Sequence, residues 1–145
     1  MSKLNIYFKK FNDNAVIPTI ATEGSAGFDL TCVSRSYDEH SKTWKYKTGI
    51  GVEIPKGYVG LLFSRSSICK KDLILSNCVG VIDSDYRGEI TAIFREVNDG
   101  FNIYEIGERC CQLIIVPYLN NINFIETDNL SNTDRGEGGY GSTGM

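Results

Sequence analysis

The chain is built from short apolar runs that alternate at close spacing with turn-forming residues. Runs of strand length and composition lie at 28–32, 44–54, 58–63, 73–75 and 90–94. The run at 110–116 is almost continuously apolar and ends at Pro117, which is typical of a buried strand. Only the stretch 64–71 interrupts this rhythm, and its serines can cap a short helix. The pattern predicts an all-β barrel or sandwich with one short helix.

Weaker signals complete this expectation. Residues 4–8 and 122–125 are expected to form short strands, and residues 16–24 a loop. The polar stretch 34–42 is expected to be an exposed loop. From residue 129 onward the chain is too polar and too rich in glycine to bury a core. We therefore expect one β domain over 1–128 and a flexible tail over 129–145.

Composition excludes several classes of function. The length of 145 residues and the hydrophobic content of 41% suit a single domain with a real core. A net charge of −3 provides no basic field for nucleic acid, and no apolar run is long enough to span a membrane. The N-terminus has no signal-peptide core, so we expect an intracellular protein with neither nucleic-acid nor membrane partners.

Cysteine and histidine usage narrows the chemistry further. Five cysteines without a Cys-x-x-Cys pair indicate buried free thiols in a reducing compartment. His40 is the one histidine of the sequence, which argues against a Cys/His zinc site and a Ser-His-Asp triad. If the chain is a hydrolase, its base is expected to be a carboxylate.

The stretch 80–90 places polar residues between two apolar runs, which predicts a hairpin of strand, turn and strand. Gly80 and Gly88 indicate sharp bends or close approaches to the backbone. Asp83 and Tyr86 on one rigid hairpin could activate a water and pack against a ring-shaped ligand. A solvated acidic turn with a surface tyrosine explains the same residues equally well.

Three further sites have two readings each. Arg65 beside Ser66 and Ser67 at a helix start suits phosphate oxygens, or is a plain cap with a solvated arginine. Asp29, between apolar neighbours, could orient a Mg²⁺-bound water or a tail residue, or simply close a turn. Gln112 lies inside an apolar run, so its amide is satisfied either by the core or by a ligand.

The tail segment 135–144 is glycine-rich without being a known phosphate loop. It lacks the Gly-Lys-Ser/Thr of a Walker motif, and no helix can follow it as in a dinucleotide fold. Its glycines let backbone amides face an anion, and Tyr140 could stack on a base. Arg135, Ser142 and Thr143 add a charge and hydroxyls. The alternative is a disordered tail without a function.

In combination and in order, these stretches resemble the five sequence motifs of the trimeric dUTPases. The matching segments are 26–30, 64–67, 80–90, 107–113 and 135–144. The third and fifth motifs are highly specific, and the resemblance spans residues 26 to 144. Tyr140 stands where the family usually has phenylalanine, Ser67 where many members have glycine, and Cys110-Cys111 where Ile-Ala is usual. None of these departures removes a chemical role.

The resemblance implies a jelly-roll-like β fold and a homotrimer with three shared active sites. One subunit of the family supplies motifs one, two and four, a second supplies the hairpin, and a third lends its tail. The implied reaction is attack of water on the α-phosphorus of dUTP, giving dUMP and pyrophosphate, with Mg²⁺ on the triphosphate. Mg²⁺ would be held mainly by phosphate oxygens, with Asp29 reaching it indirectly through water.

The same resemblance implies a role for each site residue. Asp83 would be the general base, and Tyr86 would pack on the deoxyribose and exclude a 2′-hydroxyl. The edge of uracil would be read by Asn77 and by backbone groups of Val81 and Thr91, and Gly80 and Ile82 would also bind the substrate. The inner phosphates would be bound by Arg65, Ser66, Ser67 and Gln112. The tail would close over uracil and the γ-phosphate through Arg135, Tyr140, Gly141, Ser142 and Thr143.

Two other functions fit the same fold. A dCTP deaminase needs a proton shuttle at the base ring, usually a glutamate, and the Asp83/Tyr86 stretch with the glycine-rich tail argues against it. A non-catalytic regulatory protein could bind nucleotide through the same surface, although an intact Asp83 and an intact tail argue for turnover. The expected location is cytoplasm or nucleus.

Overall fold

The computed structural model describes residues 2–142 and 144. The described residues form antiparallel strands joined by turns and two short 3-10 helices. The strands are β1 (Tyr7–Lys10), β2 (Thr19–Ile20), β3 (Phe28–Thr31), β4 (Ser34–Asp38), β5 (Thr43–Lys47), β6 (Ile50–Glu53), β7 (Tyr58–Ser64), β8 (Leu73–Leu75), β9 (Gly80–Ile82), β10 (Thr91–Glu96) and β11 (Arg109–Pro117). The 3-10 helices are η1 (Ser66–Lys70) and η2 (Asn98–Gly100).

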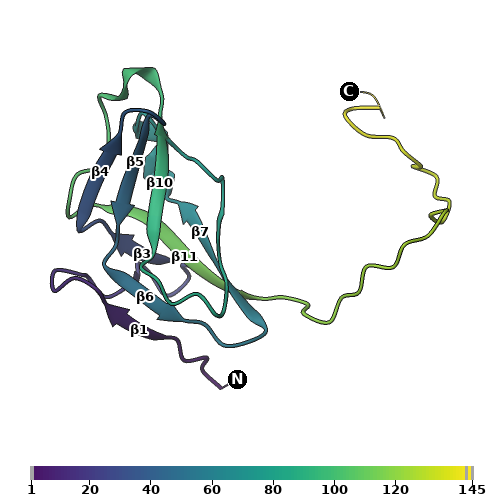
Figure 1. Ribbon diagram of the computed structural model, residues 1–145, viewed down its shortest axis with the longest axis horizontal. Helices are drawn as coiled ribbons and strands as arrows, with labels where there is room; N and C mark the ends of the chain where they lie inside the picture. Colours follow the sequence, from purple (N-terminus) through teal and green to yellow (C-terminus); the bar gives the residue numbers. More distant parts are fainter. Residues whose placement is uncertain (1, 143, 145) are drawn as a thin grey trace.

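The strands form two larger sheets and one small one. The four-stranded sheet has the order β4-β5-β10-β8, and the five-stranded sheet the order β2-β3-β11-β7-β9. A two-stranded sheet pairs β1 with β6. In Figure 1, β4, β5 and β10 lie across from β3, β7 and β11, and apolar side chains from both groups form one core. This jelly-roll-like, all-β arrangement confirms the fold expected from the strand rhythm.

Aromatic rings from distant segments meet in the core. The centroid of the Tyr46 ring lies 5.5 Å from that of Phe94 and 6.1 Å from that of Tyr104. The hydroxyl of Tyr46 donates a 3.0 Å hydrogen bond to the carbonyl of Tyr104, so the one polar atom of this ring is satisfied. Burial raises the pKa of Tyr46 to about 12. The cluster fixes the segment before β11 against the four-stranded sheet.

The five cysteines are all free thiols, but only some of them are buried. Cys32, Cys110 and Cys111 lie in the core, and burial raises the pKa of Cys32 to about 12. Cys69 and Cys78 are exposed, so the expectation that the thiols are buried is wrong for these two. The described chain contains no helix of the length and hydrophobicity that crossing a membrane requires.

Strand β11 is the element that gathers the site. It pairs with β3 on one side and with β7 on the other. In this register Gln112 lies opposite Asp29, and Cys111 lies opposite Ser64. The segments around residues 29, 64 and 112 are far apart in sequence, and this pairing makes them adjacent in space.

The expectation that residues 80–90 form a hairpin is wrong. Strand β9 pairs with β7 in the five-stranded sheet, whereas β10 pairs with β5 and β8 in the four-stranded sheet. Each of the two apolar runs thus joins a different sheet, and sequence alternation cannot show which strands pair. Residues 83–90 pass from one sheet to the other, and we call them the crossing loop.

The polar stretch expected as a loop at 34–42 contains a strand. Strand β4 forms the edge of the four-stranded sheet against β5. Its side chains cover an aromatic neighbour, because the Tyr37 ring lies 4.9 Å from that of Trp44 and the Arg35 guanidinium carbon 5.2 Å from the same ring. The loop at 16–24 likewise contains the short strand β2, and the first strand is β1 rather than 4–8.

The helix expected after residue 64 is the 3-10 helix η1, and neither serine caps it. Arg65 holds the N-cap position without a side-chain cap bond. The Ser67 hydroxyl instead shares a 2.8 Å hydrogen bond with the Tyr104 hydroxyl. Ser67 lies within η1, and its hydroxyl bonds to a buried tyrosine rather than to the backbone at the helix end.

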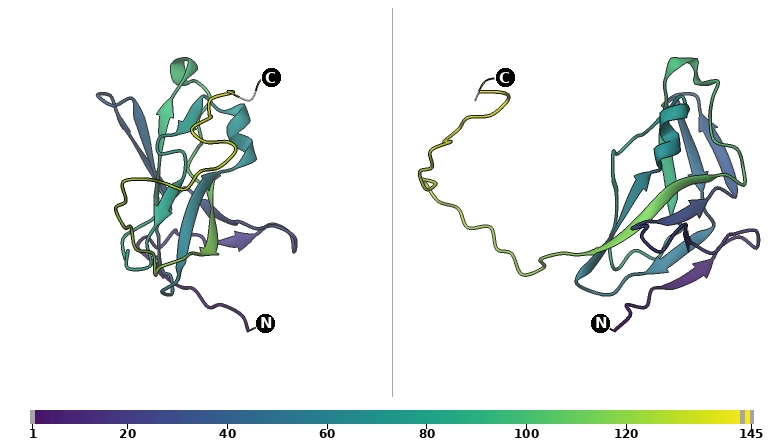
Figure 2. Two further views of the ribbon diagram at one scale, coloured as in Figure 1. Left: turned by 90° about the vertical axis from the view of Figure 1, so that its right-hand side faces the viewer. Right: turned by 180° about the vertical axis from the view of Figure 1, so that it is seen from behind.

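The strand expected at 122–125 is not formed. The backbone amide of Tyr118 donates a 3.0 Å hydrogen bond to the Gly57 carbonyl, and the chain then leaves the body of strands (Figure 1). The right-hand view of Figure 2 shows this segment arching away from the strands. The side chains of Ile122 and Phe124 are exposed, because no strand of the same chain lies beside them. The expected division of domain and tail at residue 128 stays a prediction.

We predict that Leu30→Ala lowers the free energy of unfolding by about 2–5 kcal/mol, because Leu30 is fully buried and its loss leaves a cavity. Urea unfolding followed by circular dichroism measures the change. Leu130→Ala deletes the same atoms from an exposed side chain and should change stability by less than about 0.5 kcal/mol. Equal losses in the two variants would contradict this description of the core.

Candidate active site

Five of the six substrate-binding residues expected between 77 and 91 line one cavity, and the sixth, Tyr86, does not. Its volume is about 270 Å³, and it lies between β8, β9 and β10. The expected residues in its wall are Asn77, Gly80, Val81, Ile82 and Thr91, and the remaining ones are Leu62, Ser76, Ala92 and Ile93. We call it the base cavity. Its apolar walls with a few polar groups are typical of a pocket that selects a planar ligand.

A tight turn presents Asn77 to the base cavity. Cys78 has a φ of 61°, and the amide of Val79 lies 2.6 Å from the carbonyl of Asn77. Gly80 follows directly, where a Cβ would lie 3.0 Å from the Cβ of Leu62 on β7. This close approach confirms the reading of Gly80 and keeps β9 flat against β7.

Asp83 stands at the end of β9 beside a second cavity of about 630 Å³. This cavity shares Val81 with the base cavity and is also lined by Leu61 and Tyr118. The Asp83 side chain is exposed, so its carboxylate is open to solvent and to a ligand. An exposed carboxylate next to a base-sized cavity can accept a proton from water.

Tyr86 is held in the crossing loop by its own neighbours. Its amide donates a 3.1 Å hydrogen bond to the Asp83 carbonyl, and its hydroxyl donates one of 3.1 Å to the Glu89 carbonyl. The ring folds over Gly88, where a Cβ would lie 2.5 Å from Cζ of Tyr86. Glycine at 88 is therefore required for the ring, which presents a half-exposed face.

Glu89 anchors the far end of the crossing loop, and sequence reasoning missed it. Its Oε1 accepts a 2.8 Å hydrogen bond from the Gly49 amide, and its Oε2 lies 3.7 Å from Nζ of Lys47. The Thr48 hydroxyl donates a 2.8 Å bond to the Ile90 carbonyl. The turn between β5 and β6 thus fixes the loop. A lone glutamate before a strand carries no sequence signal for this role.

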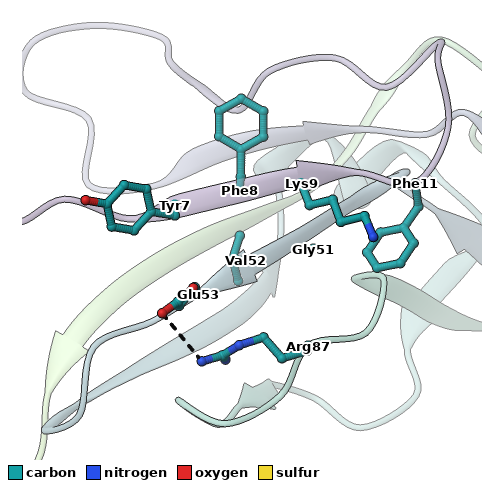
Figure 3. Close-up of a pocket in the computed structure, with 8 residues that line it drawn as sticks. All are labelled: Tyr7, Phe8, Lys9, Phe11, Gly51, Val52, Glu53 and Arg87. Carbon is teal, nitrogen blue, oxygen red and sulfur yellow. Dashed lines mark ion pairs between the residues drawn. The ribbon is translucent and has the colours of Figure 1, made fainter.

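Arg87 links the crossing loop to itself and to the end of β6. Its Nη1 donates a 2.7 Å hydrogen bond to the Ser84 carbonyl, and its Nη2 lies 3.8 Å from the Glu53 carboxylate. Figure 3 shows this ion pair at one wall of a cavity of about 370 Å³, with Tyr7 and Phe8 of β1 at the opposite wall.

Of the four residues expected to bind the inner phosphates, Arg65 and Ser67 line one cavity beside Asp29. Nε of Arg65 donates a 2.6 Å hydrogen bond to Oδ1 of the buried Asp29, and Nη1 of Arg109 donates one of 3.2 Å to Oδ2. A cavity of about 270 Å³, which we call the phosphate cavity, is lined by Arg65, Ser67, Lys71, Tyr104, Gly107, Glu108 and Arg109. Burial raises the pKa of Tyr104.

Gln112 and Ser66 lie outside the residues that line this cavity. Nε2 of Gln112 donates a 3.0 Å hydrogen bond to the Ser64 carbonyl. Gly27 leaves room for this amide, since a Cβ there would lie 3.2 Å from Cδ of Gln112. Ser66 is exposed at the start of η1. The cavity residues that sequence reasoning did not assign to the site are Lys71, Tyr104, Gly107, Glu108 and Arg109, although the last three belong to the same motif as Gln112.

The base cavity and the phosphate cavity have no lining residue in common. Asp83 belongs to the side of the molecule that holds the base cavity and does not line the phosphate cavity. A single chain therefore presents two cavities lined by different residues.

The described residues of the tail line neither the base cavity nor the phosphate cavity. Nε of Arg135 donates a 2.8 Å hydrogen bond to the Gly138 carbonyl within the tail. Tyr140 has a φ of 53° and a fully exposed ring. Gly141 and Ser142 are also exposed, and Thr143 lies outside the described residues.

Comparison with known proteins identifies the family. A family model described as dUTPase matches residues 13–144. The chain belongs to the dUTPase family. Among its dUTPase relatives, the deoxyuridine 5′-triphosphate nucleotidohydrolase of Hydrogenobaculum sp. (strain Y04AAS1) is 40% identical, covering 98% of this chain and 99% of that protein. The protein of the same name from Escherichia phage T5 is 40% identical over 88% of this chain and 91% of its own length.

A solved dUTPase structure shares the fold. The dUTPase of Staphylococcus bacteriophage 80alpha, solved with dUPNHPP, matches with a TM-score of 0.82 and 28% identity, covering 99% of this chain and 100% of that chain. The dUTPase family implies a metal requirement. Among residues 2–142 and 144, no group of three or more His, Cys, Asp or Glu side chains could hold a metal.

We predict that Glu89→Ala speeds amide hydrogen exchange of Gly49 and of the crossing loop by about tenfold. The substitution removes the carboxylate that accepts the hydrogen bond from the Gly49 amide. Mass spectrometry of deuterated peptides measures the change. Glu89→Gln keeps an oxygen acceptor and should retain most of the protection. Unchanged exchange in Glu89→Ala would show that the loop does not depend on this bond.

Proposed function

We propose that the chain hydrolyses dUTP to dUMP and pyrophosphate by attack of water on the α-phosphorus. Membership of the dUTPase family supports the activity, and the deoxyuridine 5′-triphosphate nucleotidohydrolases match along nearly the whole chain. The observation that carries the proposal is the base cavity around Asn77 with the Asp83 carboxylate directly beyond it. This arrangement suits a nucleotide whose base is buried and whose phosphates extend outward.

Asp83 is proposed as the general base. It takes one proton from water while the water oxygen bonds to the α-phosphorus, and the bond to the pyrophosphate oxygen breaks. His40, the only imidazole of the sequence, lies in the turn after β4 and lines neither the cavity beside Asp83 nor the phosphate cavity. The crossing loop keeps Asp83 in place, so catalysis depends mainly on positioning.

Selection of a deoxyuridine nucleotide is proposed to come from the base cavity and Tyr86. Asn77 and the backbone of Val81 and Thr91 would read the edge of uracil, with Gly80 and Ile82 in the wall. A narrow cavity rejects the thymine methyl by clash and cytosine by mismatched donors. The Tyr86 ring, fixed over Gly88, would pack on the deoxyribose and leave no space for a 2′-hydroxyl.

The phosphate cavity is proposed to hold the triphosphate. Arg65, Ser66 and Ser67 would contact the inner phosphates, with Gln112 beside the α-phosphate. We propose Mg²⁺ as the metal, held mainly by phosphate oxygens, where it would neutralise charge on the triphosphate. Both oxygens of Asp29 accept bonds from arginines, so we propose that Asp29 positions these side chains, and a contact with metal-bound water is secondary.

We propose that the chain works as a homotrimer with shared active sites. The base cavity of one subunit would face the phosphate cavity of a second, and a third would supply the tail. The two cavities of one chain have no lining residue in common, which supports this assembly. Apolar side chains left exposed by a single chain support it as well, with Tyr7, Phe124 and Ile125 among them. We further propose a reducing compartment, cytoplasm or nucleus, because all five thiols are free.

One assay tests this function against its alternatives. The protein is incubated with dUTP or dCTP in the presence of Mg²⁺, and both pyrophosphate and ammonia are measured. Pyrophosphate from dUTP supports the proposal. Ammonia from dCTP would instead indicate a deaminase of the same fold, and nucleotide binding without either product would indicate a regulatory protein.

We predict that Asp83→Asn lowers kcat for dUTP by about 100- to 10,000-fold while a non-hydrolysable dUTP analogue still binds, because the amide cannot take up the proton. Steady-state kinetics and calorimetry measure the two quantities. Asp85→Asn removes a charge from the same crossing loop and should keep most of the activity. Substantial turnover by purified Asp83→Asn would rule out Asp83 as the base.

We predict that deletion of residues 132–145 leaves the body folded but severely reduces activity. The described tail residues contribute no buried side chain, so the melting temperature should barely change. Tyr140 would stack on uracil for about 1–3 kcal/mol, and Arg135, Gly141, Ser142 and Thr143 would close over the γ-phosphate.

Hydrogen exchange tests this closure in the full-length chain. Exchange over residues 132–145 should be fast without ligand and slow with a non-hydrolysable dUTP analogue. Equal slowing by dUMP would show that the tail does not respond to the γ-phosphate.

A further inference from the structure

We propose that Arg109 is a second phosphate-binding cation and that Asp29 sets Arg65 and Arg109 side by side for this purpose. The inference rests on the proposed function and adds a substrate-binding residue that the motif comparison did not single out. It follows from how one buried carboxylate is shared between two arginines and from how exposed the Arg109 side chain is.

The Asp29 carboxylate is almost fully buried and accepts hydrogen bonds from two guanidinium groups. Arg65 donates to both of its oxygens, through Nε at 2.6 Å and Nη2 at 3.3 Å. Arg109 donates through Nη1 at 3.2 Å. A buried carboxylate needs one cation to balance its charge. The second arginine therefore leaves a surplus positive charge at this point of the surface.

Arg109 is the more exposed of the two arginines, so the surplus positive charge lies at the surface. Its side chain is 53% exposed, against 23% for Arg65 and 8% for Asp29. One end of its guanidinium is fixed by Asp29, and the side chain lines the phosphate cavity. An arginine fixed at one edge keeps the rest of its planar fork of donors, which matches the oxygens of a phosphate group.

The other charged groups of the phosphate cavity do not cancel this surplus. Oε2 of Glu108 accepts a 2.5 Å bond from the Glu105 amide and lies 3.5 Å from Nζ of Lys71. Lys71 Nζ also donates a 3.1 Å bond to the Ile103 carbonyl. The positively charged side chains at this cavity are Arg65, Lys71 and Arg109. The negatively charged ones are Glu108 and the adjoining Asp29. Three cations against two carboxylates attract an anion.

Ser67 makes a phosphate chain the fitting anion. Its hydroxyl shares a hydrogen bond with the neutral Tyr104 hydroxyl on the same wall, so neutral donors stand beside the arginines. Phosphate oxygens accept from hydroxyl and guanidinium donors together. Because Arg65 and Arg109 share one carboxylate, their guanidinium groups can contact neighbouring oxygens of one polyphosphate.

The test compares Arg109→Met with the full-length wild type. Binding of a non-hydrolysable dUTP analogue and of dUMP is measured by calorimetry, and kcat and KM are measured for dUTP. Affinity for the triphosphate analogue should fall by about tenfold or more, as expected for loss of a charged hydrogen bond. Affinity for dUMP should change much less, and Arg109→Lys should recover part of the loss. Arg95→Met removes an exposed arginine of β10, away from both cavities, and should behave as wild type.

A purely structural role would give a different result. It would weaken dUMP and the triphosphate analogue alike and lower the melting temperature. Unchanged analogue affinity in Arg109→Met, with an active wild type, would overturn this inference and leave the proposed function intact. A wild type without dUTP hydrolysis would overturn the function, and the analogue binding would still decide the role of Arg109.

Discussion

The pairing of β11 with both β3 and β7 is the constraint on which the rest of the structure depends. Nine residues of one strand supply the partners for two others, and this fixes which side chains stand opposite each other. Asp29 and Gln112 become neighbours only in this register, and a shift by one residue would turn them to the opposite face. The same shift would bury polar groups in the core, so the packing of Leu113 protects the geometry of the phosphate cavity.

The base cavity depends on a different feature, the passage of the chain between sheets. Strand β9 ends in one sheet and β10 begins in the other, so the crossing loop is held at both ends by ladders of hydrogen bonds. Between these ends, Glu89 and Tyr86 fasten the loop to the turn at Gly49 and to itself. Asp83 is therefore exposed yet supported by a fixed backbone. Such a carboxylate needs little reorganisation when a ligand arrives.

Local signals predicted what local chemistry determines. The strand rhythm predicted most strands, and Gly80 and Gly88 were identified because a missing Cβ reports a close approach. Pairing is a property of the whole fold, so 80–90 read as a hairpin although its runs join different sheets. The role of Glu89 and the bond between Arg109 and Asp29 depend on residues 40 and 80 positions away. The segment 122–125 has strand composition, but the single chain offers it no partner.

In the proposed assembly, the surplus charge at Asp29 also decides when the tail can close. Arg135 would bring one more cation toward a cavity that already holds more arginine and lysine than carboxylate. Without an anion this approach is opposed by repulsion and by the entropy of ordering a glycine-rich segment. A bound triphosphate turns the repulsion into attraction, because its negative charge lies between the cations. Closure and triphosphate binding are then reciprocal, so the tail raises affinity only for a ligand with enough negative charge to draw Arg135 in.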